Sequence, residues 1–465
     1  MAPPGPHPAL RAVFAGLDGA GVQWCLLRGA ATLADPADDV DLLVAPGDTA
    51  RAEHVFAALG FVRVRAWGYG SHRFHFAYHE PDDRWIKLDV VSELAFGPSY
   101  ALRAPGAAEC LARRQRLGPV FVPGPDDGFW ALLLHCLLDE RAVPAAYRDE
   151  LRALAAGATA AGPLAGALDA ACPPGWCAAA VVAAARAAAW DALADVAPVL
   201  GARWAWRDPI GTVRRTLAGA ALRRLAKPLT ALRRRGLGVA VLGPDGAGKS
   251  TAVAGVRASF RLPVRTMYMA PYRRRPAAHR PVRVPGIGLG ATLARQWARW
   301  MVAEYHQGRG RLVIFDRYGY DAMLPPRRPL SRRGRWRRRL IARACPAPGL
   351  VAVLDAPGEA LHARSGEQSA AVLERERLQY LELSRRVRRA VVIDATRDAD
   401  SVRRALIAEI WRAYGERARP SRGAREPATR RRPADPAPPP TRPPAPARPR
   451  GGSGARAGRS PRSAA

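Results

Sequence analysis

The chain has 465 residues, enough for two or three ordinary domains that each bury a core. Its 73 Lys and Arg against 40 Asp and Glu give a formal net charge of +33, yet the only lysines are Lys87, Lys227 and Lys249. The excess is therefore arginine, and it accompanies heavy use of Ala, Gly and Pro along the whole chain, which argues against a dedicated nucleic-acid interface.

The six cysteines have neither the spacing of a zinc site nor the density of a secreted disulfide scaffold, so we expect reduced thiols in a cytoplasmic protein. Residues 1–7 lack the basic and apolar regions of a signal peptide, and the Ala-rich run 178–189 is broken by Arg186. We therefore expect no membrane span. A peripheral contact between arginines and an anionic membrane stays open as an alternative, as does a homodimer.

Residues 1–122 are predicted to form an α/β domain, because short apolar runs typical of strands alternate with turns. The runs are 24–27, 40–44, 75–78 and 85–91. Residues 123–235 are dominated by Ala, Leu and Trp at helical spacing and lack β-branched runs, so they are predicted to be a helical connector.

Three carboxylates of the first domain fall in strand-like runs: Asp39, Asp41 and Asp89. Residues two apart on a strand point the same way, so Asp39 and Asp41 face one side, and a neighbouring strand can bring Asp89 beside them. Such a cluster can bind metal ions around a triphosphate. The alternative is that Asp39 and Asp41, which follow a polar turn, are simply solvated.

The order Leu26-Leu-Arg-Gly29, Asp39-Val-Asp41 and Leu88-Asp-Val90 resembles the minimal nucleotidyltransferases that modify small molecules or proteins. The resemblance implies a nucleotidyltransferase fold with Asp39, Asp41 and Asp89 as metal ligands. Three histidines between these carboxylates are expected to be surface or core residues rather than ligands: His72, His75 and His79.

Residues 239–251 read Val-Ala-Val-Leu-Gly-Pro-Asp-Gly-Ala-Gly-Lys-Ser-Thr, an apolar strand that runs into a glycine-rich turn. The pattern predicts a phosphate-binding loop (P-loop, Walker A) for ATP and Mg²⁺, against the alternative of a chance glycine turn. The glycines turn backbone N–H groups onto phosphate oxygens, Lys249 neutralises charge, and the Ser250 hydroxyl reaches Mg²⁺. The predicted nucleotide-binding residues are Gly243, Asp245, Gly246, Ala247, Gly248, Lys249, Ser250 and Thr251.

Residues 236–415 are predicted to form a doubly wound parallel sheet, because strand-like runs alternate with helical segments after the loop. The runs are 239–242, 312–315, 350–354 and 391–393. Residues 416–465 consist mostly of Pro, Arg, Ala, Gly and Ser without periodicity, so they are predicted to be a disordered tail.

The run 312–315 leads into Asp316-Arg317-Tyr318. A carboxylate at the carboxyl end of a strand can order Mg²⁺, and the adjacent arginine can grip a phosphate. Together with the loop and its internal Asp245, this motif resembles the thymidylate kinases over about residues 238–414. The resemblance implies that Asp245 lies near the acceptor's sugar and that Arg317 holds its phosphate. The alternative for Asp316 and Arg317 is a strand-end ion pair.

Three arginines further along are candidates for a catalytic lid: Arg364, Arg375 and Arg377. A lid supplies guanidinium groups to the transferring phosphoryl and expels water on closure. The segment 354–380 that contains them looks like the lid of the thymidylate kinases. The alternative is that residues 374–377, which alternate Glu and Arg, form a solvated helical face.

The acceptor is predicted to be a nucleoside monophosphate or another small phosphorylated or sugar-like compound, because segments 268–275 and 319–323 do not match the family's thymine-reading residues. The basic segment 327–343 is predicted to cover this acceptor rather than to bind nucleic acid. Two other functions stay open. The first is an ATP-switched binding protein for a polyanion, and the second is nucleotidyl transfer by the first domain with a regulatory kinase domain.

Overall fold

The computed structural model describes residues 5–36, 39–232, 236–269, 287–325, 329–366 and 368–418. The predicted tail lies outside these ranges except for its first three residues, which continue the last helix to Ala418. The acceptor segment 268–275 lies outside them from residue 270 onward, and the basic segment 327–343 is described only from residue 329.

The first sheet has five strands in the order β1-β2-β5-β4-β3, and it contains the four predicted strands. Strand β2 pairs in parallel with β5, whereas the other pairs are antiparallel. Its strands are β1 (Trp24–Leu26), β2 (Val40–Val44), β3 (Val62–Val64), β4 (Arg73–His79) and β5 (Arg84–Val91). The helices beside it are α1 (Pro8–Gly19) and α2 (Thr49–Ala58), with short 3-10 turns η1 (Ala30–Thr32) and η2 (Pro46–Asp48).

The two faces of this sheet pack against different groups of helices. Leu42 and Val44 of β2 pack with α1 and α2, whereas the intervening Leu43 packs with the helices that follow the sheet. Side chains alternate along a strand, so Asp41 lies on the same face as Leu43, toward those helices.

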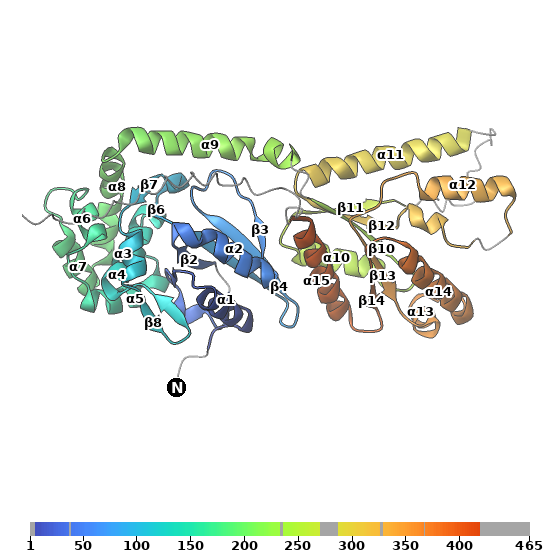
Figure 1. The fold of residues 1–465 in the computed structure, drawn as a ribbon, viewed down its shortest axis with the longest axis horizontal. Helices are drawn as coiled ribbons and strands as arrows, with labels where there is room; N and C mark the ends of the chain where they lie inside the picture. Colours follow the sequence, from blue (N-terminus) through green and yellow to red (C-terminus); the bar gives the residue numbers. More distant parts are fainter. Residues whose placement is uncertain are drawn as a thin grey trace, which may run out of the picture. The chain divides into compact units, whose positions relative to one another are not determined.

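Those helices fill the predicted connector: α4 (Pro125–His135), a π-helical turn η4 (Cys136–Glu140), α5 (Ala145–Gly157), α6 (Pro163–Asp169), α7 (Ala178–Arg186), α8 (Trp190–Trp206) and α9 (Pro209–Leu232). Before them come two hairpins, a 3-10 turn and a short helix: β6 (Leu94–Phe96), η3 (Pro98–Tyr100), β7 (Leu102–Ala104), α3 (Ala107–Ala112), β8 (Gln115–Leu117) and β9 (Val120–Val122). Figure 1 labels the helices α3 to α9 and the strands β6, β7 and β8.

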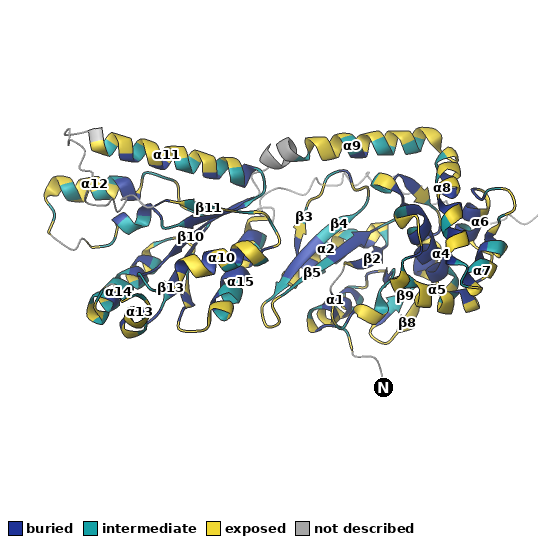
Figure 2. Cartoon of the chain, turned by 180° about the vertical axis from the view of Figure 1, so that it is seen from behind, coloured by how far each residue is buried: buried dark blue, intermediate teal, exposed yellow. Residues whose placement is uncertain are grey.

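Much of helix α9 is exposed (yellow in Figure 2), and large apolar side chains are among its exposed residues. Ile210 is 83% exposed and Leu217 is 65% exposed, with Val213 between them on the same helical stripe. Among the described helices, none combines the length and apolarity that a bilayer crossing requires.

The second sheet has five parallel strands in the order β11-β12-β10-β13-β14, which confirms the predicted parallel α/β architecture. The strands are β10 (Leu237–Leu242), β11 (Val264–Tyr268), β12 (Leu312–Asp316), β13 (Leu350–Asp355) and β14 (Ala390–Asp394). The helices are α10 (Lys249–Ser259), α11 (Ile287–Gly308), η5 (Gly319–Ala322), α12 (Arg332–Ala342), α13 (Gly358–Ser365), α14 (Ala370–Arg386) and α15 (Ala399–Ala418).

Helices cover both faces of this sheet. Val239 and Val241 of β10 pack with α10 and α15, whereas Ala240 and Leu242 pack with α11 and α14. Strand β10 is buried along its whole length, as expected of a central strand with both faces covered (Figure 2).

The core beneath α15 allows a direct test. Leu406 is fully buried against the sheet, whereas Leu378 on α14 is 56% exposed. We expect Leu406→Ala to lower the free energy of unfolding by about 2–5 kcal/mol, because it leaves a cavity. The matched control Leu378→Ala should change it by less than about 0.5 kcal/mol. Urea denaturation measures both, and equal effects would contradict the packing described here.

Candidate functional site

A glycine-rich loop, Gly243–Gly248, joins the central strand β10 to α10. Three of its glycines have positive φ: Gly243 at 148°, Gly246 at 87° and Gly248 at 78°. At Gly246 a Cβ atom would also lie 2.6 Å from the carbonyl oxygen of Leu361 on α13. The loop therefore needs glycine for its backbone conformation and, at Gly246, for space.

Lys249 begins α10 and lies inside the curve of the loop. Its side chain is buried, and its Nζ donates to the carbonyl oxygens of Gly243 at 3.0 Å and Pro244 at 2.6 Å. Burial lowers the pKa of Lys249, and the nearby Arg317 charge lowers it further. Ala247 is buried beside it, whereas Ser250 and Thr251 are exposed in the first turn of α10.

The pairing of β12 with β10 brings Asp316 to the same edge of the sheet. Val241 of β10 is opposite Asp316, so the loop and this carboxylate leave adjacent strands at one level. Asp316 and Ser250 line one hollow of about 600 Å³, together with Arg257, Thr266 and Tyr268 among others. A carboxylate and a hydroxyl at one site are oxygen ligands of the kind that Mg²⁺ prefers.

Arg317 follows Asp316 with a left-handed backbone, at φ 63°. Its guanidinium donates to Asp245 Oδ1 at 2.6 Å and lies 3.7 Å from Asp321 Oδ2. Burial raises the pKa of Asp321, and Arg317 acts to lower it. Asp321 also accepts from the Tyr380 hydroxyl at 3.2 Å. Asp321 was not among the predicted site residues, because no sequence motif sets it apart from other carboxylates on short turns.

The structure gives the three predicted lid arginines different surroundings. Arg364 donates to the carbonyl oxygens of Ala395 at 2.7 Å and Thr396 at 3.3 Å. Arg377 pairs with Asp355, Nε to Oδ1 at 2.6 Å, and with Glu374 at 2.7 Å.

Arg375 is exposed and forms no ion pair with any other described residue. In this conformation, Arg364 and Arg377 connect elements of the fold through these contacts, whereas Arg375 has no ion pair with a described residue.

The basic segment forms α12 in its described part. Arg338 donates to the carbonyl oxygens of Ala322 at 3.1 Å and Leu324 at 2.6 Å, which attaches the helix to η5 next to Asp321. Trp336 is 59% exposed on the same helix.

The carboxylates of the first sheet lie on neighbouring strands. Asp41 of β2 is directly opposite Asp89 of β5, and both are buried. Asp39 lies two residues before Asp41 and is exposed. Burial raises the pKa of Asp41, Arg28 acts to lower it, and Asp89 raises it further. Two buried carboxylates side by side favour a bound cation, because a cation relieves their repulsion.

Each of these carboxylates has a basic partner. Arg28 Nε lies 2.9 Å from Asp41 Oδ2, His72 Nδ1 lies 2.8 Å from Asp89 Oδ2, and Lys87 pairs with Asp39. His72 therefore lies at the site as the partner of Asp89, a contact that the expectation for the three histidines did not include. His75 is a buried core residue against Phe56, as expected.

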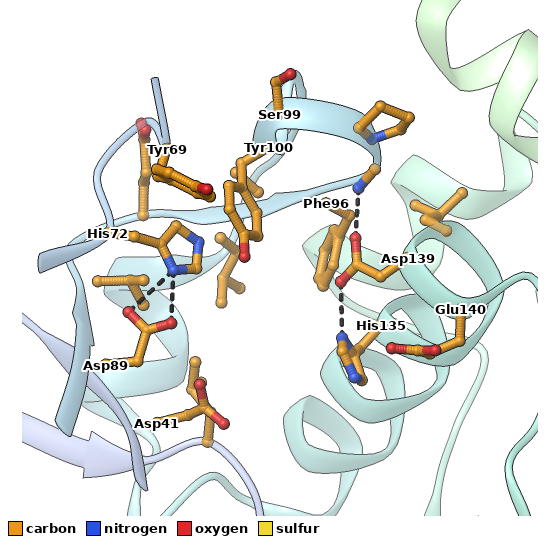
Figure 3. Close-up of a pocket in the computed structure, with 18 of the residues that line it drawn as sticks. Asp41, Tyr69, His72, Asp89, Phe96, Ser99, Tyr100, His135, Asp139 and Glu140 are labelled. Atoms are coloured by element: carbon orange, nitrogen blue, oxygen red, sulfur yellow. Dashed lines mark hydrogen bonds and ion pairs between the residues drawn. The ribbon is translucent and has the colours of Figure 1, made fainter. Parts of the chain in front are cut away.

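A cavity of about 500 Å³ opens in front of this carboxylate pair. Figure 3 shows Asp41, Asp89 and His72 on one side, with Tyr69 next to His72, and His135, Asp139 and Glu140 on the other, with Tyr100 between. The His72 ring stacks on Tyr100 with centroids 3.6 Å apart.

Several residues that line this cavity have a strained backbone conformation. Ser99, Tyr100 and Arg141 line it, and all three have left-handed φ values of 63°, 52° and 56°. Non-glycine residues adopt this conformation at a cost of about 1–3 kcal/mol and are frequent at functional sites. No sequence pattern indicated that these three residues line one cavity, since they come from separate segments of the chain.

A separate cluster of His7, His79 and Asp82 has donor atoms close enough to hold a metal ion, within 4.8 Å of one another. However, His7 Nδ1 accepts from the Ala9 N–H at 3.2 Å at the start of α1, so its proton is on Nε2, which donates to Asp82 at 2.6 Å. A metal-bound histidine instead ligates through one nitrogen and donates from the other. Although burial opposes it, hydrogen bonds from His7 and His79 lower the pKa of Asp82. These contacts describe a helix cap attached to the β4–β5 hairpin.

No protein-family profile matches this chain, and a search among curated proteins gives no significant match.

Gly246 and Gly248 of the loop provide a matched pair of variants. Gly246→Ala and Gly248→Ala both place a side chain at positive φ, which costs about 1–2 kcal/mol. Only Gly246→Ala also forces a Cβ into the Leu361 carbonyl, since nothing lies within 4 Å of a Cβ at Gly248. We therefore expect the larger fall in thermal unfolding midpoint for Gly246→Ala. Equal shifts in calorimetry would show that α13 does not lie against the loop.

Proposed function

We propose that residues 236–418 form a thymidylate kinase-like P-loop domain that transfers the γ-phosphoryl group of ATP to a small phosphorylated or sugar-like acceptor. The observation that carries the proposal is the meeting of the glycine loop, Lys249, Ser250 and Asp316 at the carboxyl edge of β10 and β12. Ligands of open parallel sheets bind at this edge, where the strand order reverses.

The residues present fit a triphosphate with Mg²⁺. The loop leads into the N-terminus of α10, where the backbone N–H groups of a helix start are a favourable position for phosphate oxygens. Ser250 and Asp316 would hold Mg²⁺, which neutralises negative charge on the phosphates. Lys249, whose Nζ bonds two loop carbonyl oxygens here, is placed to exchange them for phosphate oxygens.

Arg317 and the hollow next to Ser250 support the proposal that a small acceptor binds in the same domain. Arg317 is paired with the Asp245 carboxylate at 2.6 Å, and an acceptor phosphate would offer the same guanidinium two stronger contacts. The hollow lined by Arg257, Thr266 and Tyr268 adds groups that bind hydroxyl or phosphate oxygens. These groups suit a phosphorylated or sugar-like compound without specifying a base.

A second candidate function is metal-dependent nucleotidyl transfer in the cavity of the first sheet. The register that sets Asp41 opposite Asp89 favours it, because two adjacent carboxylates facing a cavity are suited to a divalent ion and a triphosphate. Arg28 adds a cation beside them.

All six cysteines are free thiols in the structure, four of them buried, which supports the inference of a reducing, cytoplasmic compartment.

Lys249→Ala tests the kinase proposal. We expect transfer of labelled γ-phosphate from Mg-ATP to a panel of nucleoside monophosphates, sugar phosphates and sugars to fall by about 100-fold or more, because a charge that stabilises the transition state is lost. Lys227→Ala, on α9 and outside the loop, is the matched control and should retain full transfer. ATP-dependent binding of a polyanion without transfer to any acceptor would instead favour a nucleotide-switched binding protein.

A second pair of variants distinguishes the roles of Arg377 and Arg375. Arg377→Ala should lower the free energy of unfolding by about 2 kcal/mol, because Asp355 loses a charged hydrogen-bonding partner. Arg375→Ala should leave stability unchanged and lower kcat for phosphoryl transfer by about 10-fold or more, because an exposed guanidinium is free to move onto the phosphates. Urea denaturation and steady-state kinetics measure the two effects. The lid assignment of Arg375 is wrong if kcat does not change.

A further inference from the structure

The wall of the first-sheet cavity that faces the carboxylate pair contains a histidine and an aspartate in direct contact. His135 ends α4, and Asp139 lies in the π-helical turn η4 that follows it. His135 Nδ1 is 2.7 Å from Asp139 Oδ2, and both residues line the cavity (Figure 3). π-Helical turns are rare and are frequently found at functional sites.

This contact fixes the tautomer of the His135 imidazole. An ionised carboxylate can only accept hydrogen bonds, so the proton between the two groups is on His135 Nδ1. In the neutral ring, Nε2 then has a free lone pair. Asp139 is held in turn by the backbone N–H of Gly97, which donates to its Oδ1. The orientation of the ring is therefore set by two successive hydrogen bonds, as in a general base supported by a third group.

The surroundings of the imidazole indicate the chemistry of its partner. Glu93 and Glu140 line the same cavity, and Glu140 is exposed. Carboxylates accept hydrogen bonds from hydroxyl or ammonium groups and repel phosphate. Of the arginines that line the cavity, Arg28 pairs with Asp41, Arg223 donates to Gly68 O and Ser99 Oγ, and Arg141 is exposed at the rim.

We propose that the cavity is a second active site, in which His135, oriented by Asp139, acts as the general base for an unphosphorylated hydroxyl compound, a polyol or a neutral or amino sugar. The proposal rests on the second candidate function, nucleotidyl transfer, and adds to it the base and the class of acceptor. The nucleoside triphosphate then binds on the side of Asp41 and Asp89. The hydroxyl compound binds on the opposite side, next to His135 and Asp139.

The reaction balances without a further reagent. The acceptor oxygen attacks the α-phosphorus of a nucleoside triphosphate, forming one O–P bond, while the bond from the α-phosphorus to the bridging oxygen breaks. Pyrophosphate leaves with that oxygen. The hydroxyl proton passes to His135 Nε2, and Asp139 stabilises the resulting imidazolium through Nδ1–H.

The test uses the full chain carrying Lys249→Ala, so that transfer from the P-loop domain does not contribute. Each of the four nucleoside triphosphates, labelled in the α-phosphate, is incubated with Mg²⁺ and with water, glycerol, ribitol, glucose or glucosamine. Release of pyrophosphate and labelling of the acceptor are measured. We expect both to depend on an added hydroxyl compound and to be abolished by Asp41→Asn.

The base is then tested by His135→Ala. We expect kcat to fall by about 10²–10⁴-fold at an unchanged KM for the nucleotide, with partial recovery in added imidazole. His79→Ala is the matched control, since His79 pairs with Asp82 through Nδ1 at 2.6 Å outside the cavity and should retain full activity. Asp139→Asn keeps the shape of the side chain but offers an N–H where His135 needs an acceptor, and it should also lower kcat. It provides a second measurement if His135→Ala is unstable.

The outcomes separate the two claims. Loss of activity in Asp41→Asn together with full activity in His135→Ala and Asp139→Asn would overturn the base and keep nucleotidyl transfer. Loss in His135→Ala that imidazole does not restore, with a raised KM, would assign the histidine a structural role and also overturn the base. Absence of pyrophosphate release with every nucleotide and acceptor would overturn both.

Discussion

The parallel pairing of β10 with β12 is the constraint on which the C-terminal site depends. With Val241 opposite Asp316, the glycine loop and the Asp316-Arg317 turn leave the sheet side by side. A shift of one residue in this register would turn Asp316 to the other face of the sheet, away from Ser250. The buried apolar residues of β10 resist such a shift, because both of their faces are already packed against helices.

In the first sheet, too, the register of a parallel strand pair positions the charged residues, although the other strand pairs are antiparallel. Its one parallel pair, β2 with β5, places Asp41 beside Asp89 and aims both at the helices of the connector. In both candidate sites the charges are already matched within the protein: Arg28 with Asp41, His72 with Asp89, and Arg317 with Asp245. Ligand binding at either site would therefore exchange one ionic partner for another, which costs less than burying a bare charge.

The sequence predicted the motifs of the C-terminal site better than their surroundings. Two motifs could be recognised because each has fixed residue types at a fixed spacing along the chain: the loop from Gly243 to Thr251 and the pair Asp316 and Arg317. The sequence set Arg364 apart from Arg375 and Arg377, which lie in a run that alternates Glu and Arg. Only the contacts show that Arg364 and Arg377 bond to other elements of the fold, whereas Arg375 has no ion pair with a described residue. Asp321 and His135 were not identified at all, since a single carboxylate or histidine has no spacing to recognise.

What the sequence determined by itself is the succession of strands and helices, the glycine-rich loop and the carboxylates of the first sheet, because these depend on periodicity and on residues close together in the chain. The tertiary structure decided which residues far apart in the chain share a cavity: Asp41 with Asp89, and both with His135 and Asp139. The reason is physical. Local preferences fix the conformation of a segment, whereas the contacts between segments follow from which apolar faces are buried together.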